Sequence, residues 1–102
     1  TIIAEPLGGT WMNLTGNAGM GTAGSGDILA GLIGSLAAAG MEAADAARLG
    51  VHLHGLAGDI AAESVGDAGM TASDILAALP AALREFPEGI AADPFSGRIT
   101  TV

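Results

Sequence analysis

Apolar residues recur every three to four positions along two stretches of the chain, a spacing that places them on one face of a helix. The first stretch begins at Gly26 and stops at Gly40, and its apolar face consists of Ile28, Leu29, Leu32, Ile33 and Leu36. The second stretch runs from about Ala43 to about Val65, and its apolar face consists of Leu49, Leu53, Leu56 and Ile60. The pattern therefore predicts two consecutive helices.

The longer helix has a second face marked by Gly50, His54 and Gly58, which are spaced four residues apart. Because residues at this spacing are neighbours on a helix and glycine has no Cβ, we expect another part of the backbone to approach this face. His52 and His54 point roughly 200° apart on the same helix, so they cannot share a metal ion. We expect His54 to be packed or hydrogen-bonded instead.

The start of the chain has a pattern typical of a β-hairpin. Thr1–Ala4 and Thr10–Leu14 are short β-like runs, and the five residues between them, E-P-L-G-G, form a turn sequence. A hairpin this short is marginal alone, so we expect it at the edge of a larger sheet. Trp11 is expected to pack within the hairpin.

The later part of the chain predicts one or two further helices. Thr71 followed by Asp74 matches a capping box, which starts a third helix. Pro80 either kinks that helix or starts a fourth at its first position. Arg98–Val102 is predicted to return as a terminal strand, and the acidic residues Asp59, Glu63 and Asp67 are expected to form a solvated face.

Composition and charge narrow the classes of partner. The chain has 102 residues, half of them hydrophobic and 3% aromatic, so we expect one small domain with a core of small aliphatic side chains. The net charge of −8 argues against a nucleic-acid partner and against an anionic membrane surface. No apolar run is long enough to span a bilayer. The absence of cysteine excludes disulfides and is compatible with a cytoplasmic location.

The candidate chemistry lies in the glycine-rich segment that precedes the first helix. The chain contains no lysine, so this segment is not a P-loop. The first N–H groups of a helix lack intrahelical partners and carry the positive end of the helix dipole, and glycines allow a phosphate to approach them. The sequence A-G-S-G-D at residues 23–27 therefore predicts an anion hole, with Asp27 placed to act on a substrate hydroxyl beside it. The simpler alternative is that Ser25 or Asp27 only caps the helix.

Three blocks of sequence together resemble a known family. They are T-G-N-A-G-M-G-T-A-G-S-G-D-I-L-A-G, G-V-H-L-H-G-L-A-G-D and T-A-S-D-I, within roughly Pro6 to Phe86. They are similar to the C-terminal part of the ADP- or ATP-dependent NAD(P)H-hydrate dehydratases, which are carbohydrate kinase-related members of the ribokinase-like superfamily. The resemblance implies an α/β, ribokinase-like fold. Residues 1–102 would be the C-terminal portion of a single catalytic domain whose upstream half is absent, with an edge β-hairpin followed by three or four helices.

The resemblance also implies an activity and a set of site residues. Family members repair hydrated NADH and NADPH: ATP or ADP, with Mg²⁺, phosphorylates the hydroxyl on the hydrated ring, and phosphate is then eliminated. By analogy the phosphoryl group would be bound by Ala23, Gly24, Ser25 and Gly26. Asp27 would contact the hydrated nicotinamide and take the hydroxyl proton, while Asn17 would assist through phosphate or Mg²⁺-bound water. No metal ligand is predicted within the chain.

Further expectations concern assembly and the competing functions. The resemblance implies a homo-oligomer in the intact protein and an isolated chain that is inactive or severely impaired. One alternative is a kinase of the same superfamily that acts on a sugar or a vitamin precursor, since Gly26 and Asp27 would serve both reactions. The other is a non-catalytic helical oligomerisation piece, favoured by the small-residue helix faces.

Overall fold

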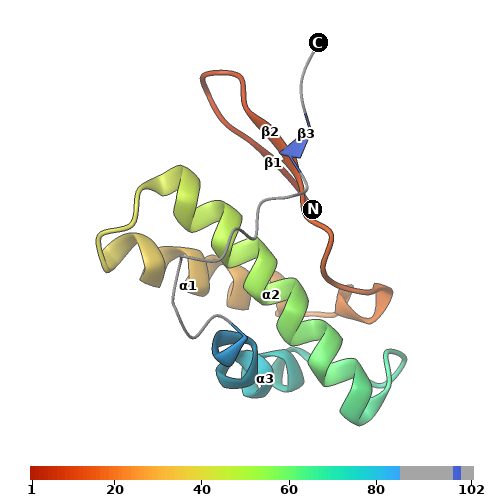
Figure 1. The fold of residues 1–102 in the computed structure, drawn as a ribbon. Helices are drawn as coiled ribbons and strands as arrows, with labels where there is room; N and C mark the ends of the chain where they lie inside the picture. Colours follow the sequence, from red (N-terminus) through yellow and green to blue (C-terminus); the bar gives the residue numbers. More distant parts are fainter. Residues whose placement is uncertain (86–97, 100–102) are drawn as a thin grey trace.

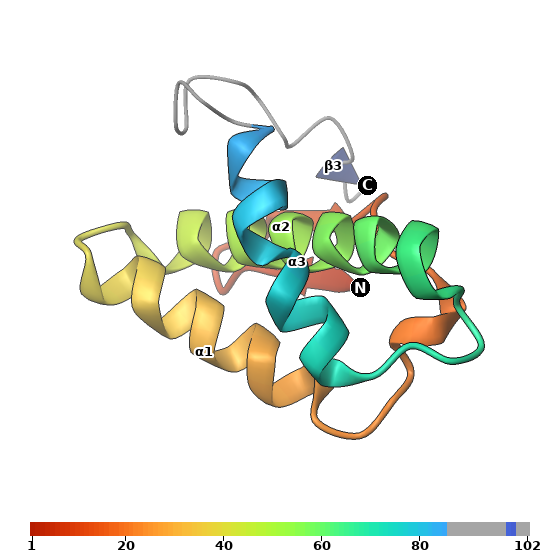
Figure 2. The same cartoon turned by 90° about the horizontal axis from the view of Figure 1, so that it is seen from below.

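The computed structural model describes residues 1–85 and 98–99. Its elements are the strands β1 (Ile2–Ala4) and β2 (Thr10–Met12), the 3₁₀-helix η1 (Ala18–Met20), the helices α1 (Ser25–Ala38), α2 (Ala43–Val65) and α3 (Ala72–Arg84), and the strand β3 (Arg98–Ile99). The long helix α2 runs through the middle of the molecule, with the small sheet on one side and α1 and α3 on the other (Figures 1 and 2). The expected hairpin followed by helices is therefore confirmed.

The sheet is antiparallel throughout, with the strand order β1-β2-β3. The hairpin turn is closed by a hydrogen bond of 2.8 Å from Glu5 N–H to Gly9 O, and Gly8 has a φ of +104°, which glycine adopts at little cost. The second strand ends at Met12, two residues before the predicted end at Leu14. The predicted terminal strand is confirmed at Arg98–Ile99, and its last three residues lie outside the described part of the chain.

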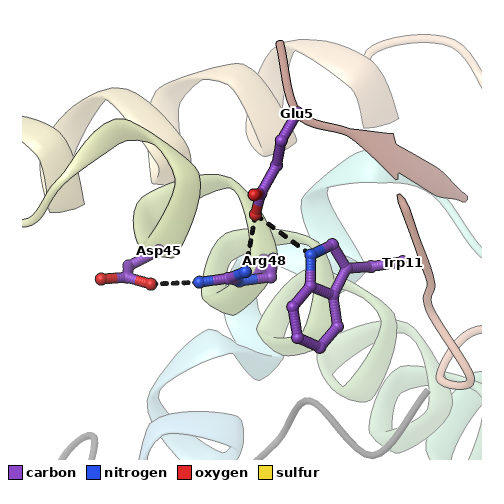
Figure 3. A network of polar contacts seen from close by, with 4 residues as sticks. All are labelled: Glu5, Trp11, Asp45 and Arg48. Carbon is purple, nitrogen blue, oxygen red and sulfur yellow. Dashed lines mark hydrogen bonds and ion pairs between the residues drawn. The ribbon is translucent and has the colours of Figure 1, made fainter. Parts of the chain in front are cut away.

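One arginine attaches the hairpin to α2 (Figure 3). The Arg48 guanidinium donates to Glu5 Oε1 at 2.6 Å, donates to the Asp45 carboxylate, and lies 4.3 Å from the centroid of the Trp11 ring. Trp11 Nε1 donates to the same Glu5 oxygen at 3.0 Å. Trp11 therefore joins the hairpin to the helix, which goes beyond the packing within the hairpin that the sequence predicted.

The core lies where α2 crosses α3. Its largest fully buried side chains are Leu53 and Ile75, and the small buried residues Ala57, Ala61 and Ala82 belong to the same cluster. The apolar face predicted for α1 is only partly buried and packs against this core from one side. Small side chains let the helices approach closely, as the composition predicted.

Two further predictions need correction, and the structure decides the open choice at Pro80. The segment before α1, predicted as loop only, contains the short helix η1, and α1 begins at Ser25, one residue earlier than expected. The helix α3 continues through Pro80, so no fourth helix starts there. Pro80 and Leu76 are both exposed, so the Leu76 carbonyl that loses its helical partner can bond to water. No helix in the described residues is both long and apolar enough to cross a membrane.

Candidate active site

A cavity of about 470 Å³ opens between α2, the hairpin end and the glycine-rich loop. The loop and the start of α1 contribute Thr15, Asn17, Ser25 and Gly26 to its lining, and α2 contributes His54 and Gly55. Three of the residues predicted to bind phosphate therefore line the cavity, together with residues of α2 that lie far from them in the sequence.

The first part of the loop is fixed to the backbone of α2. Asn13 Nδ2 donates to Val51 O at 3.3 Å, and the Thr15 hydroxyl donates to His52 O at 2.9 Å. This approach requires glycine at position 55, where an added Cβ would lie 2.2 Å from Thr15 Oγ1 and 2.7 Å from the Thr15 carbonyl carbon. These contacts explain why β2 ends early: the chain turns from the sheet to the helix.

Asp59 anchors the next part of the loop. Its Oδ2 accepts from Gly16 N–H and its Oδ1 accepts from Asn17 Nδ2, both at 3.0 Å. Asn17 Oδ1 in turn accepts from Gly19 N–H at 3.0 Å and caps η1. The expectation that Asp59 belongs to a solvated face is therefore wrong, whereas Glu63 and Asp67 are exposed as expected.

Close packing of Met20 on α2 completes the attachment of the loop. A Cβ added to Gly58 would lie 2.2 Å from Met20 Sδ, and one added to Gly50 would lie 2.6 Å from Cγ1 of Ile33 on α1. A close approach to the Gly50–His54–Gly58 face is thus confirmed, but side chains rather than backbone come nearest at Gly50 and Gly58.

The start of α1 presents several backbone donors. Gly24 has a φ of +89°, and the helical residues that follow turn successive N–H groups toward the same side. Within residues 1–85 and 98–99, the N–H groups of Ala23, Gly24 and Gly26 have no protein acceptor, while Ser25 N–H donates to Thr22 O at 3.3 Å. A Cβ added to Gly26 would meet nothing within 4 Å, so its backbone is open to a ligand.

The predicted site residues do not all lie at the cavity surface. Asn17, Ser25 and Gly26 line it, whereas Ala23, Gly24 and Asp27 are exposed outside its lining. Asp27 lies in the first turn of α1, directly after Gly26, where a carboxylate is favoured by the helix dipole. Neither Ser25 nor Asp27 provides a side-chain cap, since the N-cap residue is Gly24.

The side chains of Ser25 and His54 are buried against each other. His54 Nε2 lies 3.2 Å from Ser25 Oγ and 3.0 Å from Ser25 O, as expected for a hydrogen-bonded histidine. Burial lowers the pKa of His54, and the contact with the Ser25 carbonyl opposes that shift in part. Burial also lowers the pKa of His52. No cluster of three or more His, Cys, Asp or Glu side chains suited to a metal ion occurs among the described residues.

The close contact at Gly55 and the hydrogen bonds of Asp59 were not predicted from the sequence. A pattern for both is present, since His54, Gly55, Gly58 and Asp59 occupy positions i, i+1, i+4 and i+5 and so share one helical face. Two glycines beside two polar side chains on one face indicate a surface that binds a polar backbone segment closely.

Comparison with known proteins finds relatives that are named as NAD(P)H-hydrate repair enzymes. The family model described as NAD(P)H-hydrate dehydratase matches residues 1–81. The chain is 51% identical over 88 residues to a bifunctional NAD(P)H-hydrate repair enzyme of Thermofilum pendens, covering 86% of this chain and 17% of that protein. It is 50% identical to the enzyme of the same name from Moorella thermoacetica, covering 88% and 17%.

A shorter relative gives a similar result. The chain is 49% identical over 76 residues to the ADP-dependent (S)-NAD(P)H-hydrate dehydratase of Neisseria meningitidis serogroup B, covering 74% of this chain and 26% of that protein. The chain thus spans about a sixth to a quarter of the length of these relatives. No solved structure gives a significant match.

Proposed function

The chain belongs to the NAD(P)H-hydrate dehydratase family, and from this premise we propose that it supplies the phosphate-binding loop and the reacting carboxylate for ADP- or ATP-dependent repair of hydrated NADH and NADPH. The observation that carries the proposal is the group of unpaired backbone N–H donors at Ala23, Gly24 and Gly26, at the positive end of α1 and beside the cavity. Such donors bind a phosphate without basic side chains, which suits a chain with no lysine.

We also propose the setting of this site. Residues 1–102 form the C-terminal portion of a ribokinase-like α/β catalytic domain, with the hairpin at the edge of its sheet. Ile2 and Met12 support this, because they pair across the hairpin and their side chains are 57% and 46% exposed. An apolar pair on an open sheet face gains stability when other elements of a larger domain cover it.

In the proposed reaction, the hydroxyl oxygen on the hydrated nicotinamide ring attacks the terminal phosphorus of the nucleotide. Asp27 takes the proton that leaves that oxygen, and the unpaired N–H groups of Ala23, Gly24 and Gly26 stabilise the transferring phosphoryl group. The P–O bond to the nucleotide breaks as the new P–O bond forms, so the nucleotide leaves with one phosphate fewer. Phosphate then leaves the ring carbon with the electrons of its C–O bond while the adjacent ring carbon loses a proton, and the double bond of the dihydronicotinamide is restored. Mg²⁺, when bound to the nucleotide, would neutralise phosphate charge.

Asn17 is proposed to act next to the phosphate or to Mg²⁺-bound water. Its amide is held by Asp59 and by Gly19 N–H, so its orientation is fixed before a ligand arrives. One hydrogen of its NH₂ group and one lone pair of its oxygen stay available beyond these contacts. This arrangement fits a contact to water or phosphate better than direct binding of a metal ion.

The test is Asp27→Asn in the complete natural polypeptide. We expect recovery of NADH absorbance from hydrated NADH, with ADP or ATP and Mg²⁺, to fall by about 10²–10⁴-fold, because a general base contributes about that factor. Asp67→Asn, at an exposed aspartate, is the matched control and should retain activity.

Other outcomes separate the competing functions. A stable phosphorylated alcohol, without restored dihydronicotinamide, would identify a small-molecule kinase of the same superfamily. Failure of the folded complete protein to bind any nucleotide would favour a non-catalytic role in helical association. Equal activity of Asp27→Asn and wild type would remove Asp27 from the mechanism.

A further inference from the structure

The two buried polar side chains in the described residues, Ser25 and His54, face each other at the wall of the cavity. They are 6% and 8% exposed, so each polar atom needs a defined hydrogen-bond partner. A serine hydroxyl next to a histidine nitrogen is compatible with two hydrogen-bond arrangements. The histidine can withdraw the hydroxyl proton, or it can donate its own hydrogen and leave the hydroxyl hydrogen to point elsewhere.

The Ser25 carbonyl distinguishes between these cases. His54 Nε2 lies 3.0 Å from Ser25 O and 3.2 Å from Ser25 Oγ. A carbonyl oxygen only accepts hydrogen bonds, so the shorter contact requires a hydrogen on Nε2. That hydrogen is then shared with Oγ, which acts as an acceptor. The hydroxyl hydrogen cannot point at a nitrogen that already carries one.

The remaining direction for the hydroxyl hydrogen is the cavity. Within residues 1–85 and 98–99, Ser25 Oγ has no hydrogen-bond partner other than His54. The same cavity wall holds Gly26, whose N–H also has no protein acceptor there. A hydroxyl and an amide at adjacent residues thus form a pair of donors, and the ligand that matches such a pair is an oxyanion with acceptor atoms only.

We propose that His54 is a positioning residue: its Nε2–H holds the Ser25 hydroxyl as a hydrogen-bond donor toward the phosphate of the nucleotide. This role rests on the proposed function for the identity of the phosphate ligand, but the hydrogen assignment does not. The arrangement also excludes a nucleophilic Ser25 activated by His54, since that chemistry requires an Nε2 that accepts the proton.

The hydrogen assignment is tested directly by ¹⁵N-detected NMR on the complete polypeptide labelled at histidine. Protonated and unprotonated ring nitrogens have well separated shifts, and His54→Gln identifies the resonances of His54. We expect the neutral Nε2–H tautomer at pH 7.5, without any ligand. A neutral His54 with its hydrogen on Nδ1 would overturn the proposal, whatever the enzymatic activity.

The role of His54 in phosphate binding is tested by measuring Mg²⁺–ADP binding calorimetrically for a set of variants. Ser25→Ala should weaken binding by about tenfold, as expected for one hydrogen bond to a charged group. His54→Leu should weaken it similarly, while His54→Gln should retain affinity because the Gln Nε2 amide can donate from nearly the same place. His52→Gln, two residues away on the same helix, is the matched control and should match wild type.

The double variant Ser25→Ala/His54→Leu decides whether His54 acts through Ser25. We expect it to bind Mg²⁺–ADP no more weakly than Ser25→Ala alone. An additional loss as large as that caused by His54→Leu in the wild type would overturn the positioning role, as would unchanged binding by Ser25→Ala. If His54→Leu does not fold, the comparison of His54→Gln with His54→Asn replaces it, with loss expected only for the shorter Asn. Intact coupling without NADH recovery would reject the dehydratase while leaving this inference standing.

Discussion

Helices α1 and α2 each contain three glycines, and the surroundings of the two sets are opposite. A Cβ on Gly50, Gly55 or Gly58 of α2 would lie less than 3.0 Å from atoms of α1 or of the glycine-rich loop. A Cβ added to any of the α1 glycines would meet nothing within 4 Å; these are Gly26, Gly31 and Gly34. Figure 2 shows α1 alongside α2, with its other side uncovered by the described elements.

The contrast between the two helices shows which glycines are required by close packing and which are not. Glycine within a helix costs about 0.5–1 kcal/mol relative to alanine, so each one needs a compensating gain. In α2 the gain is visible, because the loop and α1 pack where side chains would otherwise be. In α1 only Gly26 lines the cavity, and nothing in the described structure explains Gly31 or Gly34.

The largest effect is expected from Gly55→Ala on the packed helix. The new Cβ would collide with backbone as well as side-chain atoms of Thr15, so the loop must move. Overpacking of this kind costs about 1–3 kcal/mol of unfolding free energy, measured by urea unfolding of the complete polypeptide. Gly66→Ala is an unsuitable control, because Gly66 has a φ of +77°. Gly31→Ala is the matched control, and equal stability of the two variants would break the contrast between the helices.

Gly26→Ala should separate binding from stability. Its Cβ would meet no protein atom, so unfolding free energy should not fall, but the methyl group would occupy the approach to the proposed phosphate. We expect Mg²⁺–ADP affinity to drop about tenfold or more, the equivalent of one charge-assisted hydrogen bond. Calorimetric titration of Gly26→Ala beside Gly34→Ala measures this. Unchanged affinity would show that phosphate binds elsewhere.

A smaller effect is expected from pH at the contact between the two helices. Burial lowers the pKa of His54 in the folded state from its ordinary value near 6.5. Below pH 6.5 the unfolded chain therefore binds a proton at His54 that the folded chain does not bind. The contribution of His54 to the unfolding free energy should therefore be fully present above pH 6.5 and should decline as the pH falls toward the lowered pKa. The decline between pH 7.5 and 5.5 should be smaller in His54→Gln than in wild type. His52→Gln should also reduce it, because the pKa of His52 is shifted in the same direction. If both variants lost stability with falling pH as steeply as wild type, the lowered pKa values of His52 and His54 would not be the cause of the decline.

The smallest effect is a gain. Gly31→Ala and Gly34→Ala should each raise the unfolding free energy by about 0.5–1 kcal/mol, since alanine restricts the unfolded chain and meets no neighbour here. Thermal or urea unfolding of the complete polypeptide measures it. A loss of stability instead would show that this face of α1 is covered by another segment or by a second copy. The glycines of α1 would then be required by close packing, as those of α2 are.

The local elements followed from the sequence. Apolar spacing predicted α2 at its observed bounds, and Thr71 with Asp74 predicted the capping box, in which Thr71 N–H donates to Asp74 Oδ2 at 2.8 Å. These features depend on residues within one or two turns of each other, so the sequence contains them completely. Pro80 was ambiguous because its effect depends on which side of α3 is exposed, and that is decided by packing on α2.

The sequence by itself thus determined the α-helices, the hairpin, the family and the donor-rich start of α1, but not the short helix η1. Only the tertiary structure decided what the polar residues of α2 contact. The partners of His54 and Asp59 lie 29 and 42 to 43 residues away in the chain. A carboxylate or imidazole at a given helical position has the same sequence pattern whether it faces water or a loop. The physical reason is that the choice depends on where α2 crosses the loop, and that crossing is set by the shape of the whole core.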